Sequence, residues 1–135
     1  MSAIIDPYNG LSYAKADLRA AGNLLNSEDY STSILHSQQA IEKSLKALIV
    51  AITGKRPPFV HEARLLLGHI QGIEAPKSII AKAIDIDPYY ILTRYPEESS
   101  IVFTEDRART ILDDAREVSQ WCTAQLNVIT SSKSS

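Results

Sequence analysis

The chain has 135 residues, enough for one domain with a single hydrophobic core. Its 14 basic and 16 acidic residues give a formal net charge of −2, so overall charge demands neither a nucleic-acid nor a membrane partner. The single cysteine excludes an internal disulfide, and there is neither a bilayer-spanning apolar run nor a signal-peptide pattern. We therefore expect a single cytoplasmic domain over residues 1–135.

The first predicted helix runs from about Gly10 to Leu25. Residues 1–9 precede it as a lead-in that we expect to be flexible. Apolar residues recur in this segment at helical spacing and form one stripe: Leu11, Ala14, Leu18, Ala21 and Leu25.

The longest predicted helix lies between Asn26 and Gly54, and it is expected to be the centre of the fold. Its apolar stripe is made of Tyr30, Ile34, Ile41, Leu45, Leu48 and Ile52. Gln38 fills the one polar gap, so its amide must find hydrogen-bond partners or face an interface. Gly54 suits the left-handed residue that ends a helix. The short join at residues 26–27 predicts that the first two helices run antiparallel.

Shorter helices are predicted between residues 55 and 92. One begins at His61 after a proline-rich loop, and another opens at Pro76. Asp87-Pro88 then kinks this helix or caps a new turn. Residues 93–104 lack a regular pattern. The last helix follows a cap at Thr104, and the tail 128–135 is expected to be flexible.

The apolar stripe of the last helix comprises Ala108, Ile111, Leu112, Ala115, Val118, Cys122 and Leu126. No convincing pair of strands accompanies these helices. The pattern predicts an all-α fold, an up-and-down bundle of four or five helices.

Three segments together resemble the HEPN family. They are Gln38-Gln39-Ala40-Ile41-Glu42-Lys43, the spacing Gly54…Pro58…His61, and Arg94-Tyr95-Pro96. The resemblance implies a helical bundle that is usually a homodimer, with proposed nucleotide binding. It also implies a minimal nucleotidyltransferase partner and a toxin–antitoxin context, because many members are encoded beside such an enzyme. Some branches of the family are metal-independent ribonucleases.

The ribonuclease branches carry an arginine followed, after four to six residues, by a histidine. The matching arginine here is Arg94, and no histidine follows it in the chain. The remaining candidate for a catalytic base is His61, which opens a helix after the proline loop. Arg94 and His61 are therefore the two residues that a ribonuclease of this type would use.

Arg94 and Tyr95 are the predicted ligand-binding residues, with Tyr89 and Tyr90 close by in sequence. An arginine can grip a phosphate in a fork, and an aromatic ring can stack on a base, so ATP, another nucleotide or RNA would fit. The alternative is that Arg94 anchors the loop and that Tyr95 is packed.

Lys43 and Lys46 lie three residues apart and are predicted to share one side of the long helix, where they could meet a phosphate. The alternative is that both lysines lie on a solvated face, with their aliphatic stems buried and their ammonium groups in water.

The three histidines and the lone cysteine lack metal-ligand spacing, so no metal and no cofactor are expected. Three functions stay open: a nucleotide- or partner-binding module, a ribonuclease, and a structural dimeric subunit without a ligand.

Overall fold

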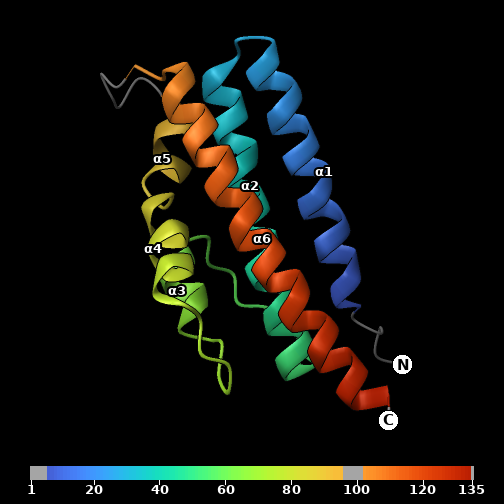
Figure 1. The fold of residues 1–135 in the computed structure, drawn as a ribbon. Helices are drawn as coiled ribbons and strands as arrows, with labels where there is room; N and C mark the ends of the chain where they lie inside the picture. The colour runs from blue at the N-terminus through green and yellow to red at the C-terminus, as the bar shows by residue number, and fades with distance from the viewer. Residues whose placement is uncertain (1–5, 96–101, 135) are drawn as a thin grey trace.

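The computed structural model describes residues 6–95 and 102–134, and every regular element in these ranges is a helix. The elements are α1 (Pro7–Asn26), α2 (Tyr30–Thr53), α3 (Ala63–Leu67), α4 (Lys77–Asp85), α5 (Tyr89–Arg94) and α6 (Glu105–Ser134). Figure 1 shows α1, α2 and α6 as long rods side by side, with α3, α4 and α5 stacked along one flank. The prediction of an all-α bundle is confirmed.

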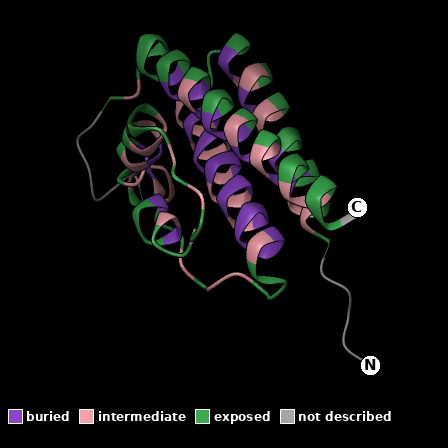
Figure 2. Cartoon of the chain, turned by 60° about the horizontal axis from the view of Figure 1, so that its bottom comes forward, coloured by how far each residue is buried: buried purple, intermediate pink, exposed green. Residues whose placement is uncertain are grey.

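Helix α2 is the central element of the bundle. It packs against α1 and α6 along its length and against α3 and α5 on a third side. Ile34, Leu45 and Leu48 on α2 are fully buried, and Figure 2 shows buried positions concentrated on the inner faces of the long helices. Helix α2 also buries polar side chains, such as Gln38, and a buried polar group needs hydrogen-bond partners within the protein.

Helix α1 begins at Pro7, three residues before the predicted start at Gly10. Pro7 suits a first helical position because it has no N–H to leave unpaired, and the Asp6 carboxylate accepts a hydrogen bond from the Tyr8 N–H at 2.9 Å. The Asp6-Pro7 pair, which the sequence pattern assigns to the lead-in, is thus the helix start itself.

The predicted end of α2 and the predicted start of α6 are both confirmed. Gly54 closes α2 with a left-handed φ of 70°. Thr104 accepts a hydrogen bond from the Arg107 N–H at 3.1 Å, and α6 starts at the next residue. The whole apolar stripe predicted for α6 is buried.

None of the helices in the described ranges is long and apolar enough to cross a membrane.

Helix α6 extends to Ser134, past residue 128, where the sequence pattern predicts the start of the tail. Part of the reason is a long-range contact, because the Lys133 ammonium donates to the Ala51 carbonyl oxygen at 2.9 Å. This cation lies in the last turn of α6, where it also complements the helix dipole.

Asp87 holds the short helices together. Its carboxylate accepts hydrogen bonds from the backbone N–H groups of Ala63 and Arg64, at 2.6 and 3.1 Å, and so caps α3. The sequence leaves open whether Asp87-Pro88 kinks the preceding helix or caps a new turn. A new helix does begin at Tyr89, but the Asp87 carboxylate caps a helix 24 residues away in the chain. Burial raises the pKa of Asp87 above its ordinary value, and the two N–H bonds only partly offset this rise. Helix α5, which begins two residues after Asp87, lies against α2.

Candidate functional site

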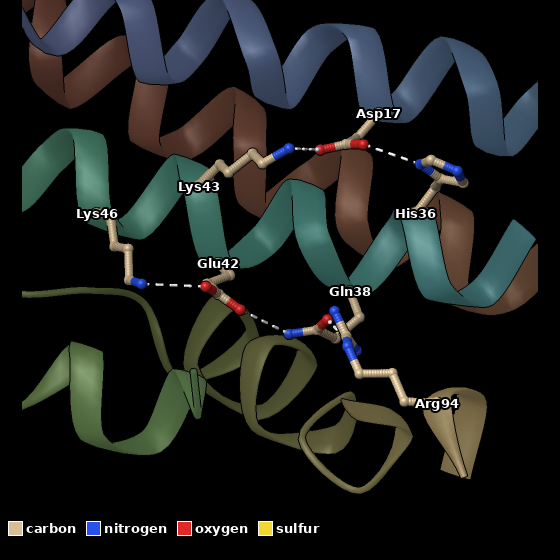
Figure 3. Close-up of polar contacts among 7 residues, drawn as sticks. All are labelled: Asp17, His36, Gln38, Glu42, Lys43, Lys46 and Arg94. Carbon is tan, nitrogen blue, oxygen red and sulfur yellow. Dashed lines mark hydrogen bonds and ion pairs between the residues drawn. The ribbon is translucent and has the colours of Figure 1, made fainter. Parts of the chain in front are cut away.

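Helix α5 brings Arg94 to the buried face of α2. The Arg94 Nη1 donates to the Gln38 side-chain oxygen at 3.2 Å and to the Tyr90 carbonyl oxygen at 3.1 Å. The guanidinium also lies 4.0 Å from the centroid of the Tyr90 ring. Gln38 is only 2% exposed, so its amide needs partners within the protein. The sequence prediction for Gln38 left open partners or an interface, and Figure 3 shows that it has partners.

Glu42, one turn further along α2, connects Gln38 to the side chains of Lys46 and His61. Its carboxylate accepts from the Gln38 amide at 3.2 Å, from the Lys46 ammonium at 3.0 Å, and pairs with His61 Nδ1 at 2.9 Å. The His61 ring in turn stacks on Tyr90, with centroids 4.5 Å apart. We call this connected group the Glu42 cluster: Gln38, Glu42, Lys46, His61, Tyr90 and Arg94.

The cluster carries more positive than negative charge. Burial by itself raises the pKa of Glu42, but the hydrogen bonds from His61, Lys46 and Gln38 outweigh it and leave the pKa below its ordinary value of 4.5. Glu42 is therefore ionised at neutral pH. Lys46 and Arg94 supply two positive charges against this single carboxylate, so the cluster has an excess of one positive charge when His61 is neutral.

Lys43 lies outside the cluster: Lys43 and Lys46 line the same cleft between α1 and α2, but their ammonium groups turn to different acidic partners. The Lys43 ammonium meets the Asp17 carboxylate on α1 at 2.6 Å, and His36 Nδ1 meets the other carboxylate oxygen at 2.9 Å. Figure 3 shows the two groups on opposite flanks of α2. The reason is that Asp17 is only 6% exposed and needs a compensating charge.

The three tyrosines proposed as ligand-binding residues have different environments. Tyr89 is 8% exposed, and its hydroxyl accepts from Arg107 Nε at 2.6 Å, so it packs between α5 and α6. Tyr90 carries Arg94 and His61 against its ring. Tyr95 is 49% exposed directly after Arg94. The rest of the predicted loop, residues 96–101, lies outside the described ranges.

Arg94 and His61 are brought together although 33 positions separate them in the sequence, since both contact the Tyr90 ring. The His61 side chain is 46% exposed. Within residues 6–95 and 102–134 no three histidine, cysteine, aspartate or glutamate side chains are grouped so that they could hold a metal ion.

Comparison with known proteins matches residues 10–126 to the model of the HEPN domain. The chain belongs to the HEPN domain family. The matched range contains all six helices in whole or in large part, so this HEPN domain includes both the Glu42 cluster and the long helices that hold it.

Individual relatives agree with this membership. The chain is 26% identical to "Putative toxin MJ1304" of Methanocaldococcus jannaschii over an alignment of 121 residues, and the match covers 78% of each protein. The crystal structure of TT1696 from Thermus thermophilus has a TM-score of 0.82 at 27% identity and covers 90% of this chain and 99% of its own. ST0689, an archaeal HEPN homologue, has a TM-score of 0.73 at 21% identity, covers 90% of this chain and 98% of its own, and supports the fold.

Five of the six residues of the Glu42 cluster are singled out by the sequence pattern, but the pattern does not connect them, and it gives Glu42 no role. A signal for Glu42 is present, because it lies four residues after Gln38 and four before Lys46 and therefore shares their face of the helix. Asp17 was missed in the same way. It lies three residues after Ala14 and four before Ala21, so it points toward the buried stripe.

Glu42 gives this HEPN domain a pH-dependent part of its stability. Since the folded-state pKa lies below the ordinary value of 4.5, the unfolded chain takes up the proton first as the pH falls. The stabilisation is complete above the unfolded-state pKa and is lost as the pH falls through the folded-state pKa. We expect Glu42→Gln to lower the free energy of unfolding at pH 7, and the difference from the wild type to shrink below about pH 4.5.

Urea denaturation followed by circular dichroism at a series of pH values measures this difference. Glu74→Gln, the same change at an exposed position, is the control and should leave the free energy of unfolding within about 0.5 kcal/mol of wild type. A Glu42→Gln effect that is constant across the pH range would contradict the assignment.

Proposed function

We propose that this HEPN domain is a nucleotide-binding module of a toxin–antitoxin system, with the Glu42 cluster as its binding site. The observation that carries the proposal is that Lys46 and His61 contact the Glu42 carboxylate while Arg94 joins them through Gln38, which leaves the cluster with an excess of positive charge. The similarity to a protein named as a toxin supports the toxin–antitoxin context.

The chemistry of the cluster suits a nucleotide. A guanidinium offers several donors in a planar fork and can hold a phosphate while one nitrogen stays on Gln38. Lys46, whose side chain is 20% exposed, adds a second positive charge nearby. Tyr95 offers an exposed ring on which a base can stack, whereas Tyr90 already carries two side chains against its ring.

The competing interpretation is a structural interaction subunit without a ligand, in which Arg94 only anchors α5 on α2. The hydrogen bonds of Arg94 to Gln38 and to the Tyr90 carbonyl serve such an anchor equally well. What favours a ligand is charge, because in the described part of the chain no carboxylate contacts Arg94 directly and the cluster remains cationic.

Ligand binding by the cluster predicts that ATP raises the melting temperature. A ligand at roughly 100 times its Kd stabilises the native state by about 2.7 kcal/mol, which corresponds to a rise of roughly 10 °C for a domain of this size. We expect Arg94→Ala to abolish the rise and Arg94→Lys to reduce it, since lysine keeps the charge but loses the fork. Differential scanning fluorimetry measures both effects.

Arg64→Ala is the matched control, because Arg64 is an exposed arginine on α3 and is not part of the cluster. It should leave the ATP-induced rise unchanged. If neither ATP, GTP nor a dinucleotide shifted the melting temperature of the wild type, the structural interaction subunit would replace this proposal.

A metal-independent ribonuclease is the second candidate, and the shared contact of Arg94 and His61 with Tyr90 favours it. Glu42 holds one nitrogen of His61, which leaves the other available for proton transfer. This candidate predicts cleavage of single-stranded RNA in the presence of EDTA, with loss of cleavage in His61→Ala. His69→Ala, at another exposed histidine, should cleave like the wild type. Absence of cleavage in the wild type would eliminate the candidate.

Two partners complete the proposal, and both rest on family membership. One is a second copy of the chain, and light scattering would show a dimer mass across micromolar concentrations. The other is a minimal nucleotidyltransferase, which co-expression and co-purification would detect. A monomer that binds no such enzyme would remove both partners without affecting the nucleotide site.

A further inference from the structure

A cleft of about 400 Å³ lies between α1 and α6, away from the Glu42 cluster. Three arginines line it, Arg19 from α1 and Arg109 and Arg116 from α6, together with a single carboxylate, Asp113. Leu18, Leu25 and Leu112 form an apolar floor. A chain with a net charge of −2 therefore concentrates positive charge along one groove.

The charges of these arginines are poorly compensated within the protein. Arg116 meets Asp113 at 3.5 Å and Arg109 meets Glu105 at 3.6 Å, and all four side chains are about half exposed or more. Ion pairs of this length and exposure contribute little to the stability of the fold. The Arg19 side chain makes no hydrogen bond or ion pair with any other residue of the described ranges. Three guanidinium groups around one groove repel one another, and an anion would relieve that repulsion.

Gly22 keeps the cleft open on the α1 side. It lies in the interior of a helix, where glycine costs about 1 kcal/mol relative to alanine. A Cβ built on Gly22 would lie 3.5 Å from Arg116 Nη2, so the Arg116 guanidinium reaches across to α1 at this position. Arg19 is three residues before Gly22 and thus on the same side of α1. The two guanidinium groups therefore approach the cleft from opposite helices.

We propose that this cleft binds a small organic phosphate, with the phosphate held by Arg19 and Arg116 and an apolar or aromatic part lying on the leucine floor. Arginine recognises phosphate with paired hydrogen bonds and stays charged at every physiological pH. Asn23 and Asn26 line the same cleft and supply amide donors and acceptors for the remainder of the ligand.

The dimensions favour a small molecule over a macromolecule. The volume falls in the range of about 300–1,000 Å³ typical of small-molecule sites. Arg109 and Arg116 are separated by two turns of α6, about 10 Å, which sets the length of the charged part of the groove. An RNA strand or a peptide helix would need a longer track of charge. The site shares no residue with the Glu42 cluster, so the two proposals stand or fall separately.

Titration calorimetry with phenyl phosphate and with inorganic phosphate tests the proposal. We expect phenyl phosphate to bind more tightly, and Arg19→Gln or Arg116→Gln to weaken its binding roughly tenfold each. Asp113→Asn should strengthen binding, because it removes the carboxylate that competes for Arg116. Gly22→Leu should block binding by filling the cleft, while the better helix propensity of leucine keeps the domain folded, as a thermal melt would verify.

Arg64→Gln is the matched control and should bind phenyl phosphate like the wild type, since Arg64 is an exposed arginine on α3 that belongs neither to the cleft nor to the Glu42 cluster. No binding at millimolar phenyl phosphate, or equal binding by the wild type and the Arg19→Gln/Arg116→Gln double variant, would overturn the site. Equal affinity for the two probes would overturn the assignment of an organic ligand. Much tighter binding of single-stranded RNA that is lost in the same double variant would replace the small molecule with a nucleic acid.

Discussion

The hydrogen bond from Arg94 to Gln38 is the contact on which the candidate site depends. Gln38 is almost completely buried in the face of α2 that meets α5, and a buried amide without partners would cost a few kcal/mol. Arg94 satisfies its oxygen and Glu42 satisfies its nitrogen. The buried Gln38 amide therefore fixes the position of Arg94, because Arg94 supplies the hydrogen bond that the Gln38 oxygen needs.

The same requirement acts on the opposite flank of α2, where the buried carboxylate of Asp17 draws in Lys43 and His36. The difference lies in the balance of charge. Asp17 is compensated within its own group, whereas the cluster around Glu42 and the groove between α1 and α6 both retain an excess of positive charge. An overall net charge of −2 therefore conceals two cationic surfaces that suit anionic ligands.

The sequence predicted the long helices well because their apolar residues recur at helical spacing. Every residue of the apolar stripe predicted between Ala108 and Leu126 on α6 is buried, so the spacing identified the inner face of this helix. Contacts between segments far apart in the chain could not be predicted in this way. Asp87 caps a helix 24 residues away, and His61, in the loop before α3, stacks on Tyr90 of α5. Lys43 and Lys46 line the same cleft, but their ammonium groups turn to acidic partners on different helices, which their spacing does not predict.

A double-mutant cycle between Gln38 and Arg94 tests the central claim most directly. Urea denaturation of Gln38→Ala, Arg94→Ala and the double variant gives the three changes in the free energy of unfolding. If Gln38 holds Arg94, the double variant loses less stability than the sum of the single variants, by a coupling energy of roughly 0.5–3 kcal/mol. Changes that add within about 0.3 kcal/mol would mean that the two side chains do not interact, and the account of the site would be wrong.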